Sequence, residues 1–377
     1  MGACREPREV PARFRVGLIG CGRIARVHRA YLQGLPQVEL VGVCDADPAA
    51  RATFASETNL PGFATTGELL ERARPQVVHV LTPPATHAAV AIEALAQRVN
   101  VLVEKPLALS VAEADEVIAA AQRSGCWVSV DHNRWFDPVV QRAAAALASG
   151  RLGRLVGVDV FQGAEAGEMD KLGAQHTHWS AQLPGGVLNN LATHPLYLMR
   201  RFAGPVRDLR VVARRLEGTW LEEVRLVAAG EQALATVTMS MRAQPFMNRL
   251  TLLGSEATVD VNLNNMTLIE RRSRQLPKLL GKVWPNLSEA VQLLAATARN
   301  TIAFATGRQR FYPGIGAHLQ ALYAAVAAGG PPPVSAAEGR DVVAWYDDIL
   351  AQSGISAARS EERRVGKECR SRWSPYH

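Results

Sequence analysis

A glycine-rich turn between an apolar run and a helical pattern could hold the phosphates of a nucleotide. The segment Gly20-Cys21-Gly22-Arg23-Ile24-Ala25 follows the apolar run 14–19. Glycines allow a tight turn and close approach of backbone N–H groups to a pyrophosphate, and the positive end of the following helix favours that anion. Asp45 closes the next apolar run, at a spacing where a carboxylate can bind a ribose. The residues expected at this dinucleotide site are Gly20, Gly22, Arg23, Ile24 and Asp45.

Charge near the expected ribose favours NAD over NADP. Asp45 and Asp47 would repel a 2′-phosphate, whereas a carboxylate accepts hydrogen bonds from a free diol. Arg23 and Arg51 are the opposing charges in the same stretch. We therefore expect NAD as the cofactor, with NADP as the less favoured alternative.

Two further segments carry side chains that could act on a substrate oxygen. Lys105 follows the apolar run 100–103, and the carboxyl ends of strands in a doubly wound sheet line the ligand crevice. An ammonium there could polarise a carbonyl or stabilise an alkoxide while hydride moves. Asn190 and His194 are four residues apart in a predicted helix, so they share one face. His194 could take a proton from a substrate hydroxyl, because the ordinary pKa of histidine lies near working pH.

The order of apolar runs predicts an α/β protein with two domains. Residues 13–131 alternate short apolar runs with helical patterns, which predicts a Rossmann-type, doubly wound parallel sheet that binds NAD. Residues 132–355 form a second α/β domain, in which alternating segments between 206 and 263 predict an open, mostly antiparallel sheet. Residues 359–377 lack apolar periodicity and resemble a translated sequencing adapter, so we expect a disordered, non-native tail.

Composition narrows the class of protein. The 377 residues are 48% hydrophobic and 20% charged, with neither an apolar run long enough to span a membrane nor an apolar leader. The five cysteines show no pairing pattern, which is typical of free thiols in the cytoplasm. We expect a cytoplasmic protein without a membrane partner.

Two clusters of polar residues could bind a metal or a nucleic acid, but we expect neither ligand. His176-Thr177-His178 has the spacing of a metal pair on a strand, but few acids lie near it, so we expect no metal. A basic cluster lacks interleaved aromatic residues and predicts a solvated loop rather than a nucleic-acid surface. Its members are Arg271, Arg272, Arg274, Lys278 and Lys282.

Four segments together resemble the glucose-fructose oxidoreductase, inositol dehydrogenase and rhizopine-catabolism family (Gfo/Idh/MocA). The resemblance covers about residues 13–355, and its most specific segments are Gly20–Ala25, Thr82–His87, Glu104-Lys105-Pro106 and Gly185–His194. It implies an NAD(P)-dependent dehydrogenase that acts on CH–OH groups of sugars, cyclitols or related polyols. It also implies a homo-oligomer formed through the C-terminal sheet.

The resemblance implies roles for individual residues. Lys105 would be the catalytic lysine and His194 the acid/base. The residues that would line the nicotinamide half are Thr82, Pro83, His87 and Glu104, and those that would contact substrate are Asn133, Arg134 and Tyr312.

Asn190 departs from the family pattern and keeps other functions open. Many members have an aspartate four residues before the histidine, and an amide can bind a hydroxyl group but cannot carry charge. One alternative is a redox-neutral lyase or glycosidase, in which NAD oxidises a ring carbon only transiently. Another is a non-catalytic sensor that binds NAD. The retained Lys105 and His194 favour an enzyme.

Overall fold

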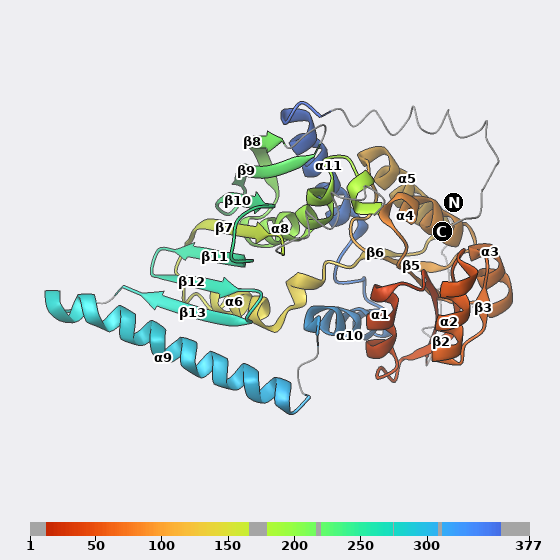
Figure 1. The fold of residues 1–377 in the computed structure, drawn as a ribbon, viewed down its shortest axis with the longest axis horizontal. Helices are drawn as coiled ribbons and strands as arrows, with labels where there is room; N and C mark the ends of the chain where they lie inside the picture. The colour runs from red at the N-terminus through yellow and green to blue at the C-terminus, as the bar shows by residue number, and fades with distance from the viewer. Residues whose placement is uncertain (1–12, 166–178, 216–219, 274, 308–310, 356–377) are drawn as a thin grey trace, which may run out of the picture.

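The computed structural model describes residues 13–165, 179–215, 220–273, 275–307 and 311–355, which fold around two sheets (Figure 1). The tail 359–377 and the segment His176–His178 lie outside the described residues. In the first sheet all strands are parallel, in the order β3-β2-β1-β4-β5-β6. The strands are β1 (Phe14–Ile19), β2 (Val38–Cys44), β3 (Gly62–Phe63), β4 (Val77–Val80), β5 (Asn100–Val103) and β6 (Val128–Val130). The expected doubly wound sheet is confirmed.

Helices cover both faces of this sheet, which explains why its strands are almost continuously apolar. Ser110 caps one of them by accepting a hydrogen bond from the Glu113 N–H, and Gly125 ends it in the left-handed conformation. The helices are α1 (Arg23–Leu32), α2 (Pro48–Thr58), α3 (Thr66–Glu68) with the π-helical turn Leu69–Ala73, α4 (His87–Ala96) and α5 (Val111–Ser124).

The second sheet has the order β13-β12-β11-β7-β10-β9-β8, and all its pairs are antiparallel except β7 with β10. The expected open, mostly antiparallel sheet is therefore confirmed. Its strands are β7 (Leu155–Gly163), β8 (Val206–Arg215), β9 (Leu221–Gly230), β10 (Leu234–Ser240), β11 (Asn248–Gly254), β12 (Ala257–Asn262) and β13 (Thr267–Arg272).

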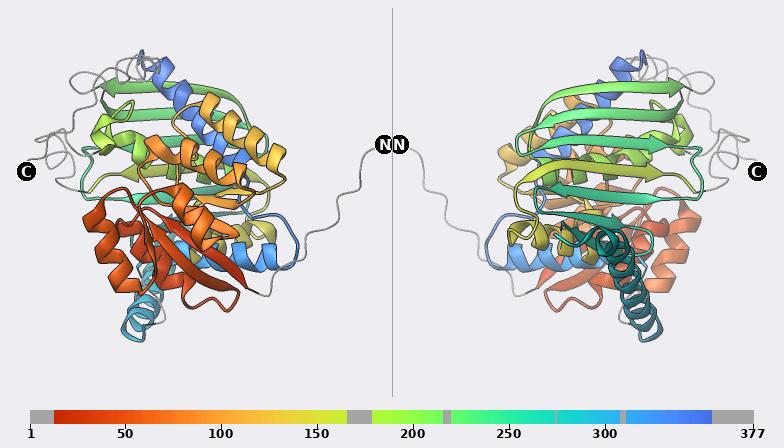
Figure 2. Two further views of the ribbon diagram at one scale, coloured as in Figure 1. Left: turned by 90° about the vertical axis from the view of Figure 1, so that its right-hand side faces the viewer. Right: turned by 90° about the vertical axis from the view of Figure 1, so that its left-hand side faces the viewer.

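One face of the second sheet packs on helices and the other is largely open (Figure 2). Apolar side chains of the inner face share a core with three helices, α6 (Pro138–Ala148), α8 (Val187–Ala203) and α11 (Ala336–Gln352). The long helix α9 (Lys278–Ala305) follows β13 and projects from the sheet (Figure 1).

The prediction that the basic cluster forms a loop is wrong for the members that the structure describes, and Arg274 lies outside the described residues. Arg271 and Arg272 lie on the edge strand β13, and Lys278 and Lys282 lie in the first turns of α9. The strand was missed because its charged residues form ion pairs, of Arg271 with Asp260 and Glu289, instead of alternating with apolar ones. The start of α9 was missed because a glycine and a proline interrupt its pattern.

Helix α10 (Pro313–Ala327) belongs by sequence to the second expected domain but packs on the first sheet. Leu319 and Leu322 are fully buried in one core with Val16 and Leu18 of β1. The Tyr323 hydroxyl lies 2.8 Å from Nε2 of His79 on β4. Helix α10 therefore connects residues 132–355 to the first sheet. The domain boundary near residue 131 stays a prediction.

This packing predicts that Leu319→Ala destabilises the protein. Leu319 is fully buried, so the cavity should lower the free energy of unfolding by about 2–5 kcal/mol, measured by urea denaturation. Leu279→Ala is the matched control: its side chain is 75% exposed on α9, and the change should stay within about 0.5 kcal/mol. Equal losses in the two variants would contradict this account of α10.

Candidate active site

The glycine turn is shaped for a pyrophosphate. Gly20 has φ +100°, and a Cβ there would lie 2.7 Å from the Leu81 carbonyl oxygen, so only glycine fits. Gly22 caps α1 without a side-chain hydrogen bond, and an added Cβ would meet no heavy atom within 4 Å. The space beside Gly22, at the start of α1, is therefore open, as an anion site at a helix N-terminus requires. Arg23 is exposed at this end, and Ile24 packs partly on the core.

Asp45 is fixed at the end of β2 beside this turn. Its Oδ2 accepts a hydrogen bond of 2.7 Å from the Cys21 N–H, and its Oδ1 accepts one of 2.9 Å from the Asp47 N–H. Asp47 itself caps α2, and Arg51 donates to the Asp45 backbone carbonyl at 2.6 Å. A half-buried, preorganised carboxylate in this place fits a ribose diol better than a phosphate.

The loop after β4 is joined to the loop after β5 through His87. This histidine is fully buried, with Nε2 2.8 Å from the Thr82 carbonyl oxygen and Nδ1 2.7 Å from the Pro106 carbonyl oxygen. Pro83 is exposed at the rim, and the Thr86 hydroxyl donates to the Thr82 hydroxyl at 2.8 Å. His87 thus holds the segment around Lys105 in register with the Thr82 loop.

Behind Lys105 lies a buried cluster of acids and histidines. Glu104 turns inward: its Oε2 accepts from the Lys105 N–H at 2.9 Å, and its Oε1 lies 3.9 Å from Nε2 of His28. Asp131 lies 3.3 Å from the same nitrogen and 2.6 Å from Nδ1 of His318. Negative charge is therefore concentrated beneath the lysine.

Protonation of His28 balances part of this charge. Burial acts to lower the pKa of His28, but contacts with Asp131 and Glu104 raise it to about 9. Ligand atoms of His28, Glu104 and Asp131 lie within 4.8 Å of one another and could reach a single cation. A protonated His28 and a protonated Lys105 already neutralise the two carboxylates, so charge balance requires no metal.

Lys105 meets α8 at Asn190. Its Nζ donates to the Asn190 backbone carbonyl at 2.9 Å and to Asn190 Oδ1 at 2.8 Å. These bonds bring together two segments that lie 85 residues apart in the sequence. Burial lowers the pKa of Lys105 from its ordinary value, while Glu104 and Asp131 oppose the shift.

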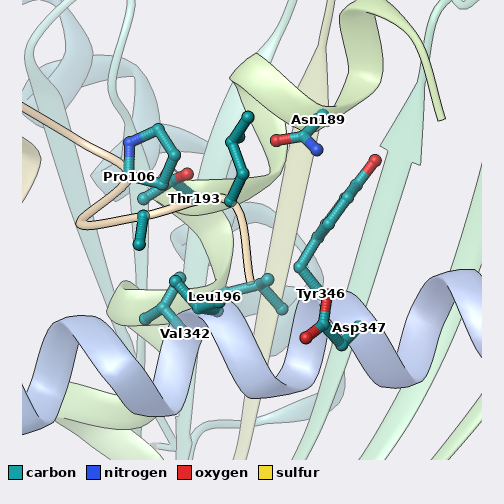
Figure 3. Close-up of a pocket in the computed structure, with 10 residues that line it drawn as sticks. Pro106, Asn189, Thr193, Leu196, Val342, Tyr346 and Asp347 are labelled. Atoms are coloured by element: carbon teal, nitrogen blue, oxygen red, sulfur yellow. The ribbon is translucent and has the colours of Figure 1, made fainter. Parts of the chain in front are cut away.

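Glycines set the start of α8. Gly185 and Gly186 have φ +78° and +73°, and a Cβ on either would collide with Tyr346 or Trp220. The small pocket in Figure 3 lies between α8, α11 and Pro106, and Asn189, Thr193 and Leu196 of α8 line it. Asn189 and Tyr346, which line this pocket, both donate to the Pro184 carbonyl, and these bonds connect the start of α8 with α11.

His194 is held by Tyr197, one turn further along α8. Its Nδ1 lies 2.9 Å from the Tyr197 hydroxyl, and the two rings meet edge to face. Burial, followed by the positive charges of Lys105 and Arg134, lowers the pKa of His194 well below its ordinary value. The expectation of a pKa near working pH is therefore wrong, and the imidazole is neutral at pH 7.

The expected substrate residues lie around this pair. Arg134 belongs to the 3₁₀ turn Asn133–Phe136, donates its backbone N–H to the Tyr197 hydroxyl at 2.8 Å and pairs with Asp137. Asn133 is half-buried in the same turn, against Gly314. Tyr312 is 44% exposed at the start of α10, and among the described residues no hydrogen bond joins it to Lys105 or His194.

Tyr197 is the main residue that sequence reasoning missed. It lies three residues after His194, so helical spacing already placed both on one face. The buried pair His28–Asp131 carried no such signal, because its members are distant in sequence and meet only through the fold.

The fold and the site define a two-domain protein of the NAD-binding oxidoreductase class. The chain belongs to the Gfo/Idh/MocA family. Residues 14–132 match the family described as oxidoreductases with an NAD-binding Rossmann fold, and residues 140–260 match the GFO/IDH/MocA C-terminal domain.

Named relatives are similar over part of their length. The chain is 31% identical over 230 residues to 1-carboxy-3-chloro-3,4-dihydroxycyclohexa-1,5-diene dehydrogenase of Comamonas testosteroni, which covers 55% of this chain and 53% of the relative. It is 28% identical over 192 residues to the rhizopine catabolism protein MocA of Rhizobium meliloti, with 51% and 58% covered. The chain thus spans about half the length of these curated relatives.

Solved structures share the fold. Levoglucosan dehydrogenase in complex with NADH has a TM-score of 0.75 at 19% identity, with 91% of this chain and 97% of that chain covered. The WlbA dehydrogenase of Bordetella pertussis, in complex with NADH and UDP-GlcNAcA, has a TM-score of 0.74 at 20% identity, with 92% and 98% covered.

Two glycine substitutions should separate folding from NAD binding. Gly22→Ala should leave the melting temperature unchanged, because the new methyl group meets no atom, yet raise the Kd for NAD about tenfold or more by filling the space at the start of α1. Gly20→Ala should lower the melting temperature as well, because of its positive φ and the Leu81 carbonyl. Calorimetric titration with NAD measures the affinity, and wild-type affinity in Gly22→Ala would contradict the assignment.

Proposed function

We propose that the protein transfers hydride between NAD and a secondary alcohol of a sugar, cyclitol or related polyol. The observation that carries the proposal is the contact of Lys105 with Asn190, which places an ammonium beside His194. Lys105 follows β5, and β4 alone separates this strand from β1, which leads into the glycine turn. The carboxyl ends of these parallel strands form the edge where such sheets bind ligands.

Each residue has a role that follows from its contacts. Bound NAD supplies the hydride acceptor, held by the Gly20–Gly22 turn and Asp45. Lys105 uses two of its three N–H donors on Asn190, which leaves the third for a substrate oxygen. His194 approaches the same oxygen from α8, and the Arg134 side chain is available for a neighbouring hydroxyl.

The names of relatives support a hydroxylated ring as the substrate. They include UDP-N-acetylglucosamine 3-dehydrogenase, glucose-6-phosphate 3-dehydrogenase and D-apiose dehydrogenase. The structures include levoglucosan dehydrogenase and a putative myo-inositol dehydrogenase. The compounds in these names all carry secondary alcohols. UDP-N-acetylglucosamine, glucose 6-phosphate, D-apiose, levoglucosan and myo-inositol therefore form the panel for a first assay.

Replacement of Lys105 tests the function directly. Lys105→Met should lower kcat by about 10²-fold or more on the panel compound that wild type oxidises, because it removes the amino group at the reacting oxygen. The Kd for NAD should not change. Formation of NADH is followed by absorbance, and its net accumulation separates oxidation from a redox-neutral reaction. Lys282→Met, at an exposed lysine on α9, is the control, and full turnover by Lys105→Met would refute the proposal.

We propose further that the protein forms a homo-oligomer through the open face of the second sheet. Exposed apolar side chains lie on adjacent strands there, among them Val227 at 53% and Leu234 at 64% exposure. Val212 on β8 is 75% exposed. A sheet face that is apolar and uncovered gains stability when a second copy covers it.

Charge on this face should dissociate the oligomer. Sedimentation velocity should give wild type a mass above that of the 40.7 kDa chain, and Leu234→Glu should shift it to the monomer. Leu279→Glu makes the same change at an exposed leucine near the start of α9 and should leave the oligomer intact. If Leu279→Glu dissociated the oligomer and Leu234→Glu did not, the interface would lie on α9, and the proposed sheet interface would be wrong.

We also propose that the protein works in the cytoplasm. Cys21 and Cys44 are buried free thiols, which fits a reducing compartment. Among the described segments, none of the helices combines the length and the apolar character needed to cross a bilayer.

A further inference from the structure

The hydroxyl group of Tyr197 has one hydrogen to donate and one evident acceptor. It already accepts the backbone N–H of Arg134 at 2.8 Å, and the side chain is fully buried. Burial raises the pKa of Tyr197 well above its ordinary value, so the hydroxyl keeps its proton. His132 stacks face to face on the phenol ring, with the ring centroids 4.3 Å apart, and neither of its ring nitrogens has a hydrogen-bond partner among the described residues. Nδ1 of His194, at 2.9 Å, remains as the acceptor among the described residues.

This hydrogen bond sets the tautomer of His194. A neutral imidazole has one N–H and one acceptor nitrogen. If Nδ1 accepts the Tyr197 proton, the ring hydrogen must lie on Nε2. In the opposite arrangement Nδ1–H would donate to Tyr197, and a buried hydroxyl proton would be left without an acceptor, which costs free energy. The nitrogen that is not bound to Tyr197 is therefore a donor.

We propose that Tyr197 is a positioning residue that holds His194 as the Nε2–H tautomer, so that His194 gives a neutral hydrogen bond to the reacting oxygen while Lys105 carries the proton. The inference rests on the proposed hydride transfer and reassigns the proton within that site. Asn190 fits this division of roles: its Oδ1 binds Lys105, and an amide, unlike a carboxylate, does not raise the proton affinity of His194.

The step balances as follows. In the direction of oxidation, the C–H bond of the secondary alcohol breaks and its electron pair leaves as hydride, which reduces NAD to NADH. Lys105 first releases the proton of its third N–H bond to water, which leaves a lone pair on Nζ. The O–H bond of the substrate then breaks and its proton passes to this lone pair, so the C–O single bond becomes a carbonyl. The Nε2–H of His194 donates to this oxygen before and after the transfer and keeps its own proton. Burial lowers the pKa of Lys105, which favours the release of the lysine proton.

Nuclear magnetic resonance of the full-length protein tests the tautomer without any substrate. Two-bond ¹H–¹⁵N correlation spectra of protein labelled at histidine, with NAD added, show which ring nitrogen carries hydrogen, and the loss of one signal in His194→Gln assigns it. We expect a neutral Nε2–H ring at pH 7 in wild type. In Tyr197→Phe the signal should move towards the Nδ1–H form, because Nδ1 has lost its donor.

A second buried tyrosine provides the matched control. Tyr323→Phe removes a fully buried hydroxyl that contacts His79, so it should alter the His79 signal and leave His194 unchanged. An Nδ1–H ring or an imidazolium at His194 in wild type would overturn the proposal. So would an unchanged His194 signal in folded Tyr197→Phe protein, with folding checked by circular dichroism.

Activity separates a hydrogen-bond donor from a proton carrier. Glutamine also presents an N–H donor but cannot take up a proton, so His194→Gln should retain kcat within about tenfold on the panel compound that wild type oxidises, whereas His194→Leu should lose more. If His194 carried the proton, His194→Gln would fall by about 10²- to 10⁴-fold, which would overturn the proposal. If wild type oxidises no panel compound, the proposed function fails, and the spectra still decide the tautomer.

Discussion

The contact between the Lys105 ammonium and Asn190 is the interaction on which the rest of the site depends. It joins the loop after β5 to the helix α8, and so joins the sheet that holds the nucleotide to the sheet that carries the second domain. An ammonium is costly to bury unless partners satisfy it. Asn190 provides two acceptors above, and the acids Glu104 and Asp131 provide negative charge below. The positive charge of Lys105 is therefore stabilised by the Asn190 oxygens on one side and by the two acids on the other.

Much of this architecture could be predicted from local pattern. The glycine turn, Asp45 and Lys105 lie at the ends of apolar strands, where chain order and parallel pairing dictate that they meet at one edge. Strand β13 and the first turns of α9 could not be predicted, because ion pairs and helix-breaking residues conceal their periodicity. In these segments tertiary contacts override local preference.

The chemistry of the site was harder to predict than its residues. From the sequence alone, His194 is expected to have the ordinary pKa of histidine. In the fold, burial and the neighbouring cations lower that pKa, and the Tyr197 hydroxyl is hydrogen-bonded to one ring nitrogen. These effects depend on distances between groups that periodicity does not report. Asn190 illustrates the same limit: by sequence it is a departure from a pattern, and in the fold it is the partner of the lysine.

The position of α10 has a consequence for how the chain acquires its shape during translation. The core beside β1 is completed by Leu319, Leu322 and Tyr323, some three hundred residues after the strand that they cover. Domains usually fold as units in the order in which they leave the ribosome. Here the nucleotide-binding sheet leaves first, together with α1 and α2, but lacks the part of its covering layer that α10 supplies until most of the chain has been made. The apolar surface that α10 covers stays exposed for that interval, which makes the nascent protein a natural client for chaperones.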